Sequence, residues 1–493
     1  MKLCELLPAA GGVLLQGDPR AEVRALCCDS RAVTPGALFV CLPGQHADGH
    51  DFAAAAVRAG AVGIVCERPV PGLPPGVPAA QVPHARIALA QLACRLYGDP
   101  ARRMTMIGVT GTKGKTTVAW LLAAMLAAAG RKAGVLGTNG AQWPGHRVPL
   151  PRTTPESCDL QALLRRMADD GCDACVMEVS SLGLQQHRVD GILFDIGIFT
   201  NLSPDHIGPG EHADFAEYLA CKSELFRRCR VGVVNADDPH AAAVLARRTC
   251  RVVRYGVQDP AAWRALPGWQ PRRAPGFLGV DFTAVGPAGQ ALRCRVGMPG
   301  RYSVYNALAA LAAAGVLDLP HAAMQTGLQT CVVRGRTEVV PLDAPFTVVL
   351  DYAHNAAAAQ SVLRALRACR PARLVALFGC GGGRSRVRRF GMGEACARLA
   401  DACIVTEDNS RGEPLDAIWA DIRAGMQRGG PGTPCVLIAD RRKALYYALD
   451  HARTGDIIAV LGKGHETTLQ RGAEALPFDE REIIQTYMRK KQA

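Results

Sequence analysis

Short apolar runs alternate with helical stretches along most of the chain. Residues 37–42 (ALFVCL) and 61–67 (AVGIVCE) are β-rich runs, and the segment between them, 51–61, has a helical pattern. Runs of this kind separated by a helix indicate an α/β domain. A Pro-rich segment at 68–80 predicts a surface loop, so we place the end of this first domain further on, near residue 100.

The middle of the chain repeats the order strand then helix. Helices are expected from residue 116 and near 159–170, each between two apolar runs. Because parallel neighbours in a sheet need crossover connections, this order predicts a parallel sheet covered by helices. We expect its strands at residues 104–110, 132–138, 174–180, 195–202 and 231–238.

A Gly- and Pro-rich stretch at 266–277 interrupts this alternation before a β-like segment and a helix at 302–317. The alternation then restarts, which predicts a second parallel sheet. A chain of 493 residues is too long for one core, so we expect an α/β protein of three domains, 1–100, 101–332 and 333–493. Strands of the last domain are expected at 346–354, 373–380, 402–409, 435–440 and 456–464.

The composition is that of an ordinary globular protein, with 49% hydrophobic and 20% charged residues. The net charge of +13 is compatible with nucleic-acid binding, but no run of five basic residues occurs, and an anionic small substrate explains the charge equally well. We therefore expect no nucleic-acid partner. Only nine of the 57 basic residues are Lys, so an Arg carries little information here and a retained Lys carries more.

The chain has 19 Cys, and Cys172 with Cys175 forms its only C-x-x-C pair. Irregular spacing of this kind predicts reduced cysteines rather than a disulfide or metal framework. The first residues do not resemble a signal peptide because Glu5 interrupts a short apolar run, and the most apolar helical stretch, from residue 118, is too short to span a bilayer. We expect a soluble, cytoplasmic, monomeric protein without membrane insertion.

The stretch 107–117 (IGVTGTKGKTT) follows an expected strand and opens a helix, as a phosphate-binding loop does. Glycines let backbone N–H groups converge on phosphate oxygens, and the helix N-terminus adds a partial positive charge. Lys115 would reach the transferred phosphate and Thr116 would hold Mg²⁺. The loop is shorter than usual, because Val109 stands where the first glycine is expected. The residues assigned to ATP here are Gly111, Thr112, Lys113, Gly114, Lys115, Thr116 and Thr117.

Charged side chains follow two further strands of this sheet. Glu178 ends a buried strand, at the edge where open α/β sheets place their sites. A carboxylate there is costly unless it meets a cation, which favours Glu178 as an Mg²⁺ partner over a capping residue. Asp205 and His206 follow the next strand to the same edge, and His206 is either a metal ligand or a structural histidine.

Ten short motifs occur in an order that resembles the Mur ligases of peptidoglycan synthesis: GTKGKTT, EVSS, FTNLSPDH, CKSELF, YNALAA, GRTEVV, DYAHN, FGCGGGR, DNSR and GKGHE. Residues 28–52 are similar to the family's uridine-nucleotide domain, so the resemblance covers nearly the whole chain. It implies a central P-loop ATPase-like parallel sheet. An N-terminal α/β domain would bind the uridine nucleotide, and a C-terminal Rossmann-like α/β domain would bind an amino acid.

The resemblance implies that ATP, with Mg²⁺ as cofactor, phosphorylates the D-glutamate carboxylate of UDP-N-acetylmuramoyl-L-alanyl-D-glutamate. The amine of meso-diaminopimelate or L-lysine would then attack this acyl phosphate. The catalytic residues that the resemblance implies are Lys115, Glu178, His206 and Lys222. Thr116 and Glu178 would hold one Mg²⁺, and His206 and Lys222 a second. The family's equivalent of Lys222 is carbamylated, which needs a primary amine that can lose its proton, as arginine cannot.

Matching positions imply three further sets of binding residues. The uridine nucleotide and its muramoyl dipeptide would contact Ser30, Gln45, His46, Ala47, Thr153, Thr154, Ser180, Gln186 and Arg188. Further contacts to ATP would come from Asn306, Arg336 and Asp351. The incoming amino acid would contact Arg384, Asp408, Asn409, Ser410, Arg411, Gly462 and Glu466.

We choose meso-diaminopimelate over L-lysine, because its additional carboxylate needs a cation and Arg411 can grip it through two parallel N–H bonds. Positions that depart from the family's usual pattern are Lys113, Leu182, Gly383, Ser385 and Ser410. The alternatives are the same ligase with L-lysine, a folylpolyglutamate synthetase-like ligase, and an inactive paralogue that binds cell-wall partners. Intact Lys115 and Glu178 argue against the last of these.

Overall fold

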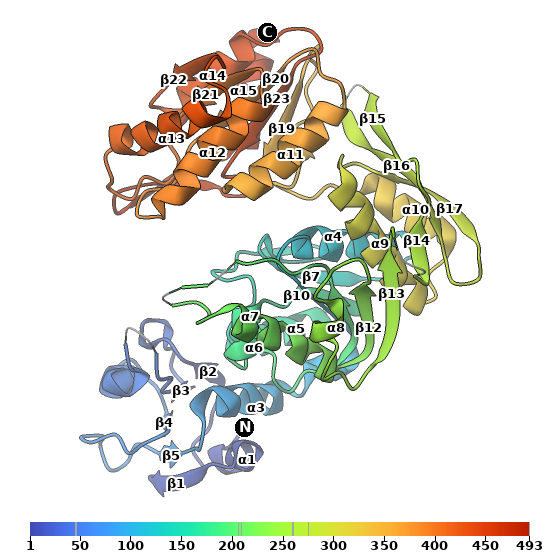
Figure 1. Cartoon of the computed structure of the whole chain (residues 1–493). Coiled ribbons are helices and arrows are strands. Elements are labelled where there is room, and N and C mark those ends of the chain that lie inside the picture. Colours follow the sequence, from blue (N-terminus) through green and yellow to red (C-terminus); the bar gives the residue numbers. More distant parts are fainter. Residues whose placement is uncertain (45–46, 206, 209, 259–260, 275, 493) are drawn as a thin grey trace. The chain divides into compact units, whose positions relative to one another are not determined.

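The computed structural model describes residues 1–44, 47–205, 207–208, 210–258, 261–274 and 276–492. Within this part of the chain the expected alternation of strands and helices is confirmed, in an α/β fold (Figure 1). The chain divides into two compact units. The first comprises Met1–Arg264 with Ala309–Gly327, and the second comprises Ala265–Leu308 with Leu328–Ala493.

The first unit begins with a five-stranded sheet and its helices: α1 (Leu3–Leu6), β1 (Val13–Gln16), β2 (Ala25–Cys27), β3 (Ala37–Val40), α2 (Ala53–Arg58), β4 (Gly63–Cys66), β5 (Ala79–Gln81) and α3 (Ala85–Tyr97). The strand order is β1-β5-β4-β3-β2, where β1 runs antiparallel to β5 and the others run parallel. Leu38 and Val40 of β3 pack with α3, and Phe39 packs with α2. The sequence did not predict β1, β2 or β5. β2 and β5 have only three residues each, and none of the four residues of β1 is buried.

A larger sheet follows in the same unit, with β6 (Thr105–Thr110), α4 (Lys115–Ala128), β7 (Ala133–Gly137), β8 (Gly140–Trp143), β9 (His146–Val148), α5 (Ser157–Asp169), β10 (Ala174–Glu178), α6 (Ser181–Gln185), β11 (Phe194–Phe199), α7 (Phe215–Ser223), β12 (Cys229–Asn235), α8 (Ala241–Val244) and β13 (Arg251–Gly256). Its strands lie side by side in the order β13-β12-β11-β6-β10-β7-β8-β9. The strands from β13 to β7 in this order run parallel. Because β6 lies between β10 and β11, the residues that follow these three strands emerge side by side at one edge.

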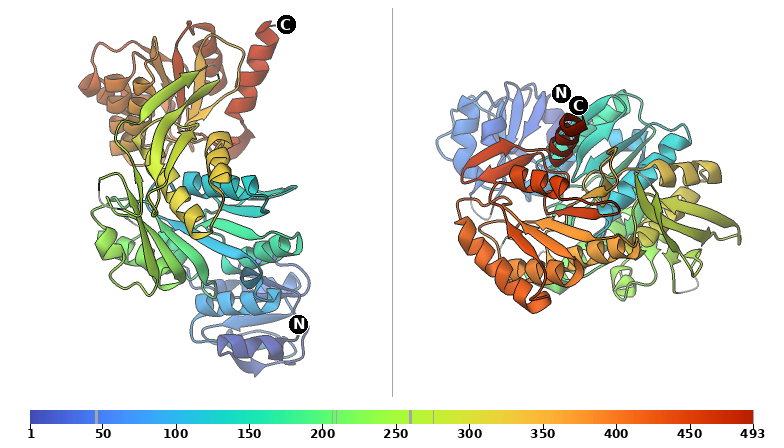
Figure 2. Two further views of the ribbon diagram at one scale, coloured as in Figure 1. Left: turned by 90° about the vertical axis from the view of Figure 1, so that its right-hand side faces the viewer. Right: turned by 90° about the horizontal axis from the view of Figure 1, so that it is seen from above.

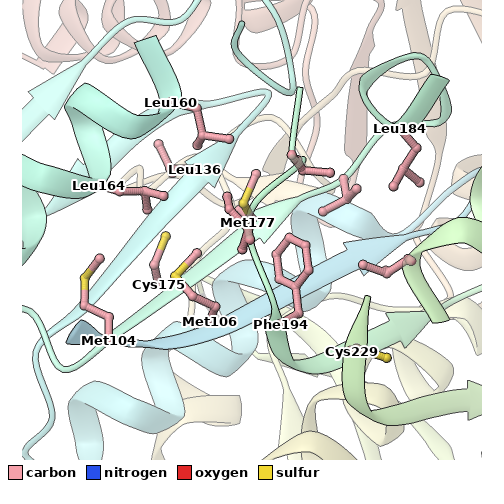
Figure 3. Packing of buried hydrophobic residues seen from close by; sticks show 14 of the residues in the cluster. Met104, Met106, Leu136, Leu160, Leu164, Cys175, Met177, Leu184, Phe194 and Cys229 are labelled. Carbon is pink, nitrogen blue, oxygen red and sulfur yellow. The ribbon is translucent and has the colours of Figure 1, made fainter. Parts of the chain in front are cut away.

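The core on one face of this sheet consists of side chains from the central strands and α5. Met106 of β6, Met177 of β10 and Phe194 of β11 are fully buried. Figure 3 shows them gathered with Leu160 and Leu164, which project from α5. Close packing of this kind gives the polar residues at the strand ends a rigid support.

The second unit contains an antiparallel ribbon and a six-stranded sheet. The ribbon comprises β15 (Gln270–Ala274), β16 (Phe277–Val285) and β17 (Ala291–Val296). The remaining elements are β18 (Glu338–Val339), β19 (Thr347–Asp351), α11 (Ala356–Ala368), β20 (Leu374–Phe378), α12 (Arg386–Leu399), β21 (Ala402–Val405), α13 (Leu415–Gly429), β22 (Cys435–Leu437), α14 (Arg441–Asp450), β23 (Ile457–Leu461), β24 (Thr468–Arg471), β25 (Glu474–Pro477) and α15 (Glu480–Gln492). Three elements contain residues of both units, namely β14 (Trp263–Ala265), α9 (Arg301–Val316) and α10 (His321–Thr330).

Helices cover both faces of the six-stranded sheet, whose order is β18-β19-β23-β20-β21-β22 (Figure 2). On one face Phe378 of β20 packs with residues of α11, α12 and α13, and on the other Leu377 packs with residues of α14 and α15. The strands β19, β23, β20, β21 and β22 run parallel. This is a doubly wound arrangement, as the Rossmann-like expectation requires.

Several strands end earlier than the sequence predicted. The strands expected at 402–409 and 456–464 end at Val405 and Leu461. The polar and glycine residues beyond these points leave the sheet and form loops. The functional motifs therefore lie in loops at the carboxyl ends of the strands.

Helices α12 and α13 approach each other backbone to backbone. A Cβ atom on Gly393 would lie 2.1 Å from the Ile422 carbonyl oxygen, and one on Gly425 would lie 2.0 Å from the Phe390 carbonyl oxygen. We call the residues of this close approach the glycine seam; they are Gly393, Gly425 and Gly429. The seam fixes the spacing of the two helices and of the loops that precede them.

The 19 cysteines are free thiols in the structure, and most of them are buried. No helix in the described part of the chain combines the length and the apolar character that crossing a bilayer requires.

Candidate active site

The loop between β6 and α4 has the backbone geometry of a phosphate-binding loop. The φ angles of Gly111 and Gly114 are 142° and 88°, in the region that favours glycine. A Cβ atom on Gly111 would lie 1.9 Å from Thr200 Oγ1, so a larger residue does not fit. Thr116 and Thr117 are buried in the first turn of α4, where helix N–H groups lack intrahelical partners.

The segment that follows β11 holds this loop in place. The Thr112 N–H donates to the Asn201 carbonyl oxygen (2.8 Å), and the Lys113 N–H donates to Asn201 Oδ1 (3.0 Å). The Thr200 hydroxyl donates to the Lys113 carbonyl oxygen (2.6 Å), and the Lys113 ammonium pairs with Asp205 (2.9 Å). The FTNLSPDH segment therefore shapes the phosphate loop, a role that sequence reasoning did not assign to it.

Two lysine amines converge on the Gly111 carbonyl oxygen. Lys115 Nζ donates to it at 2.8 Å and Lys222 Nζ donates at 3.0 Å. Lys222 projects from α7, is 1% exposed, and lies 4.5 Å from the centroid of the Tyr218 ring. Burial, together with the charge of Lys115, lowers the pKa of Lys222 well below its usual value. Lys222 is thus the lysine best placed to present a neutral amine.

Glu178, at the end of β10, is buried and accepts three hydrogen bonds. The Thr116 hydroxyl donates to Oε1 (2.9 Å), the Thr138 N–H donates to the same oxygen (2.8 Å), and the Thr138 hydroxyl donates to Oε2 (3.2 Å). The Thr138 hydroxyl also lies 3.2 Å from that of Thr153. A Cβ atom on Gly137 would lie 2.2 Å from Glu178 Oε1, so the carboxylate needs a glycine beside it. Sequence reasoning missed Thr138, which follows β7 at the same sheet edge.

The oxygens of Thr116 and Glu178 form a donor set that suits Mg²⁺, because the ion prefers carboxylate and hydroxyl oxygens. Among the residues that the structure describes, no three His, Cys, Asp or Glu side chains gather as a metal site. His206, the expected partner in a second site, lies outside the described residues. An unmodified Lys222 would repel a cation, so its assignment as a ligand depends on the carbamate.

A second polar cluster surrounds the start of α6. The Ser180 N–H donates to Thr154 Oγ1 (3.0 Å), and this hydroxyl donates to Ser180 Oγ (3.1 Å). Arg188 is 7% exposed and donates to the Thr154 carbonyl oxygen (3.0 Å) and to Gln186 Oε1. It also pairs with Glu156 at 3.0 Å. The structure therefore brings together four of the residues expected to bind the muramoyl dipeptide.

The expected contacts to the uridine nucleotide are only partly described. Ser30 opens a short turn and is partly exposed, and Ala47 is exposed. Gln45 and His46 lie outside the described residues. The nucleotide assignment of these four residues stays a prediction.

In the second unit, the expected ATP residues have structural partners. Asp351, at the end of β19, is buried and accepts hydrogen bonds from the Thr337 N–H (2.6 Å) and the Thr337 hydroxyl (3.1 Å). Burial raises the pKa of this carboxyl. The Arg336 guanidinium lies over the Tyr352 ring, 5.0 Å from its centroid, and Asn306 is buried on α9. Asp351 therefore holds the turn at Thr337, and its contact with ATP stays a prediction.

The loops after β21 and β23 meet around a lysine that sequence reasoning missed. Lys463 is 0% exposed, and its Nζ donates to Glu466 Oε2 (2.9 Å) and to Asn409 Oδ1 (3.3 Å). The Asn409 amide donates to the same Glu466 oxygen (3.0 Å), and Asp408 Oδ1 lies 4.0 Å from Nζ. Three of the expected amino-acid-binding residues thus lie around the Lys463 ammonium. The sequence contained a sign of this role, because Lys463 is one of the few lysines of the chain and lies within the GKGHE motif.

The other expected amino-acid residues lie in loops of the same unit. Arg411 is exposed, has a φ of 50°, and donates to the Gly382 carbonyl oxygen (3.2 Å). Arg384 is exposed in the loop that contains Gly382. A Cβ atom on Gly382 would lie 1.7 Å from the Ser410 carbonyl oxygen, so the two loops touch. Gly462 has a φ of 112°, a value that favours glycine.

Known proteins resemble this chain over nearly its whole length. Three family models match, described as Mur ligase family, catalytic domain (residues 22–97), Mur ligase middle domain (109–314) and Mur ligase, glutamate ligase domain (335–464). Two relatives are named UDP-N-acetylmuramoyl-L-alanyl-D-glutamate--2,6-diaminopimelate ligase. The one from Caldanaerobacter subterraneus subsp. tengcongensis is 37% identical over 98% of this chain and 98% of its own, and the one from Alkaliphilus metalliredigens is 38% identical over 97% and 96%. A solved structure of a ligase with the same name has a TM-score of 0.70 and 27% identity, and covers 100% of both chains.

Proposed function

Because the chain belongs to the Mur ligase family, we propose that it is an ATP-dependent ligase that adds meso-diaminopimelate to the D-glutamate of UDP-N-acetylmuramoyl-L-alanyl-D-glutamate. The observation that carries this proposal is the convergence of a phosphate-binding loop, the buried Glu178 and the buried Lys222 in one unit. Relatives named for this activity match from end to end, which disfavours a folylpolyglutamate synthetase-like ligase.

The chemistry begins with two anions that must meet. A carboxylate oxygen of D-glutamate attacks the γ-phosphorus of ATP, and the new O–P bond forms as the bond to ADP breaks. Lys115 and the N–H groups of the phosphate loop would stabilise the charge on the transferred group and hold the reactants in line. Mg²⁺, held by Thr116 and Glu178, would neutralise charge on the phosphates. The amine of the amino acid then attacks the acyl carbon, which forms the amide and releases phosphate.

Lys222 is proposed to act as its carbamate. Carbon dioxide adds to a neutral amine, so that an N–C bond forms and a proton is released, and the product carries one negative charge shared by two oxygens. The buried position of Lys222 and its lowered pKa support this assignment, because they favour the neutral amine. With His206 it would hold a second Mg²⁺.

The substrates are proposed to bind to three domains, 1–100, 101–332 and 333–493. The ranges of the three family models, 22–97, 109–314 and 335–464, support this division. In this arrangement the first domain takes the uridine nucleotide, the second takes ATP and the muramoyl dipeptide, and the third takes the amino acid. We also propose that the protein acts as a monomer in the cytoplasm, where ATP and the nucleotide substrate occur.

The choice of amino acid is proposed to rest on two arginines. Arg384 and Arg411 lie on touching loops, and either guanidinium can bind the far-end carboxylate of diaminopimelate through two parallel N–H bonds. L-Lysine has no such carboxylate, so it would leave both cations without this partner.

The test is phosphate release by the purified protein with ATP, the dipeptide nucleotide and each of several amino acids. We expect kcat/KM for meso-diaminopimelate to exceed that for L-lysine by about a hundredfold or more. A preference for L-lysine would overturn the choice of amino acid. Phosphate release with tetrahydrofolate and L-glutamate, and none with the dipeptide nucleotide, would overturn the proposed function itself.

A further inference from the structure

Two loops of the second unit lie against each other at the carboxyl edge of the six-stranded sheet. The glycine loop, residues 379–385, joins β20 to α12, and the DNSR loop, residues 406–414, joins β21 to α13. The Gly382 N–H donates to the Asn409 carbonyl oxygen (3.0 Å), and Arg411 donates back to the Gly382 carbonyl oxygen (3.2 Å). The position of either loop therefore depends on that of the other.

One ion pair contacts both loops. Arg389, in the first turn of α12, is 2% exposed and makes two parallel bonds to Glu413, from Nη1 to Oε1 (2.7 Å) and from Nη2 to Oε2 (2.6 Å). Glu413 Oε2 also accepts a bond from the Gly383 N–H (2.9 Å), and Arg389 Nη2 donates to the Gly381 carbonyl oxygen (3.4 Å). The pair thus links the DNSR loop, the glycine loop and α12.

This pair does more than balance charge. Arg389 also lies 3.2 Å from Asp421 of α13, a carboxylate that it shares with Arg386 (2.6 Å), so Glu413 is the second carboxylate for two arginines. The Glu413 side chain is only partly buried, at 30% exposed, and its second function in the structure is to accept the Gly383 N–H. A bidentate pair of charged groups fixes relative orientation more strictly than a single bond does.

We propose that Arg389 and Glu413 form a positioning pair that holds the glycine loop and the DNSR loop in one arrangement, and so sets the preference for an amino acid with a second carboxylate. The inference rests on the proposed function, in which Arg384 and Arg411 bind that carboxylate. Neither member of the pair touches the substrate. Their effect is to keep the two binding guanidiniums at the spacing that one carboxylate requires, and displacement by about 1 Å at such a site is costly.

The test uses the full-length protein with Glu413→Gln, which keeps the shape of the side chain but removes its charge, and Arg389→Lys, which keeps the charge but not the two parallel bonds. For each variant, KM for meso-diaminopimelate, kcat/KM for L-lysine, KM for the dipeptide nucleotide and the unfolding temperature are measured. We expect KM for meso-diaminopimelate to rise about tenfold, with the other two kinetic quantities unchanged. Arg398→Met is the matched control, because Arg398 is exposed on the same helix and pairs with Glu394, outside the network of Arg389 and Glu413.

The outcomes separate this inference from the proposed function. If wild-type protein prefers meso-diaminopimelate and both variants keep its KM, the positioning role is overturned and the proposed function stands. A parallel loss of all kinetic constants with a lower unfolding temperature also overturns it, because this is the result of general destabilisation. If wild-type protein does not use meso-diaminopimelate, the proposed function and the inference fall together.

Discussion

Single lysines identify the chemistry of this chain better than its many arginines do. Lys222 and Lys463 are both fully buried, each at a candidate site, and Lys115 contacts the phosphate loop. Lysine offers a titratable amine and freely rotating donors, which arginine cannot replace. The sequence identified Lys115 and Lys222 through their motifs. It did not identify Lys463, because the contact of this lysine with Asn409 joins segments that lie far apart along the chain.

Replacement of Lys222 tests the carbamate directly. Lys222→Ala should lower kcat by about a hundredfold or more, because it removes the oxygens that would complete the second Mg²⁺ site. Acetate should restore part of the activity by placing a carboxylate in the vacated space. A variant that retains near-normal activity, or one that acetate does not rescue, would contradict the assignment.

The pH dependence of wild-type activity tests the same residue. Because burial holds the pKa of Lys222 well below its usual value, the amine is neutral above that lowered pKa and becomes charged as the pH falls through it. Activity lost in buffer free of carbon dioxide should therefore return on addition of bicarbonate, and the recovery should decline toward acidic pH. Activity that does not depend on carbon dioxide at any pH would count against a carbamate.

Arg411 is the residue to change for the amino-acid site. Arg411→Ala should raise KM for meso-diaminopimelate by about a hundredfold, since losing a bidentate pair with a carboxylate costs about 2–4 kcal/mol. KM for the dipeptide nucleotide should stay nearly constant. Arg388→Ala, at an exposed position on α12, is the control and should leave both values unchanged. An unchanged KM in the Arg411 variant would show that another residue binds the carboxylate.

At the scale of elements, the strands of the two large sheets were predictable because a strand in the middle of a parallel sheet is apolar on both faces. Every residue of β10 and β20 is buried. The strand ends were not predictable to the residue. Thr406 and Glu407, for example, continue the β-like pattern of β21 but belong to the loop that leads to Asp408. Where such a strand ends depends on contacts between segments that lie far apart along the chain, and the sequence does not specify these contacts.

The glycine seam gives a prediction for helix packing. Alanine favours a helix over glycine by about 1 kcal/mol, yet Gly425→Ala should lower the free energy of unfolding by about 1–3 kcal/mol. The reason is that the new Cβ would lie 2.0 Å from the Phe390 carbonyl oxygen, which is backbone and cannot rotate away. Urea unfolding measures the change. Gly432→Ala, where a Cβ would have no atom within 4 Å, is the control, and a more stable Gly425 variant would refute the seam.

At the scale of the whole molecule, the cysteines behave as small buried side chains. Cys4 and Cys435 are exposed, whereas residues such as Cys331 and Cys403 are buried, and burial raises the pKa of each of these two thiols to about 12. Since the thiolate is the reactive form, a maleimide or iodoacetamide reagent at neutral pH should label Cys4 first, followed by Cys435, which is exposed but whose pKa is raised by burial of its thiol. After unfolding without reductant, all 19 thiols should react. A lower final count would reveal disulfides, and rapid labelling of most thiols in the folded protein would contradict the burial.

The overall architecture was more predictable than the binding sites. Alternating strands and helices, separated by a Gly- and Pro-rich stretch, were sufficient to predict an α/β chain with two large parallel sheets. The site residues required motif spacing, and contacts such as those of Thr138 with Glu178 depend on which strands are neighbours in the sheet. Sequence order does not specify that β6 lies between β10 and β11.

The glycine seam also bears on how the protein could be re-engineered. Because α12 and α13 touch backbone to backbone, the gap between the loops that precede them is set by helix spacing and not by the loop side chains alone. A directed-evolution library confined to those loops would keep that gap nearly constant. Selection for diamino acids of a different length should therefore enrich substitutions at the seam, outside the two loops.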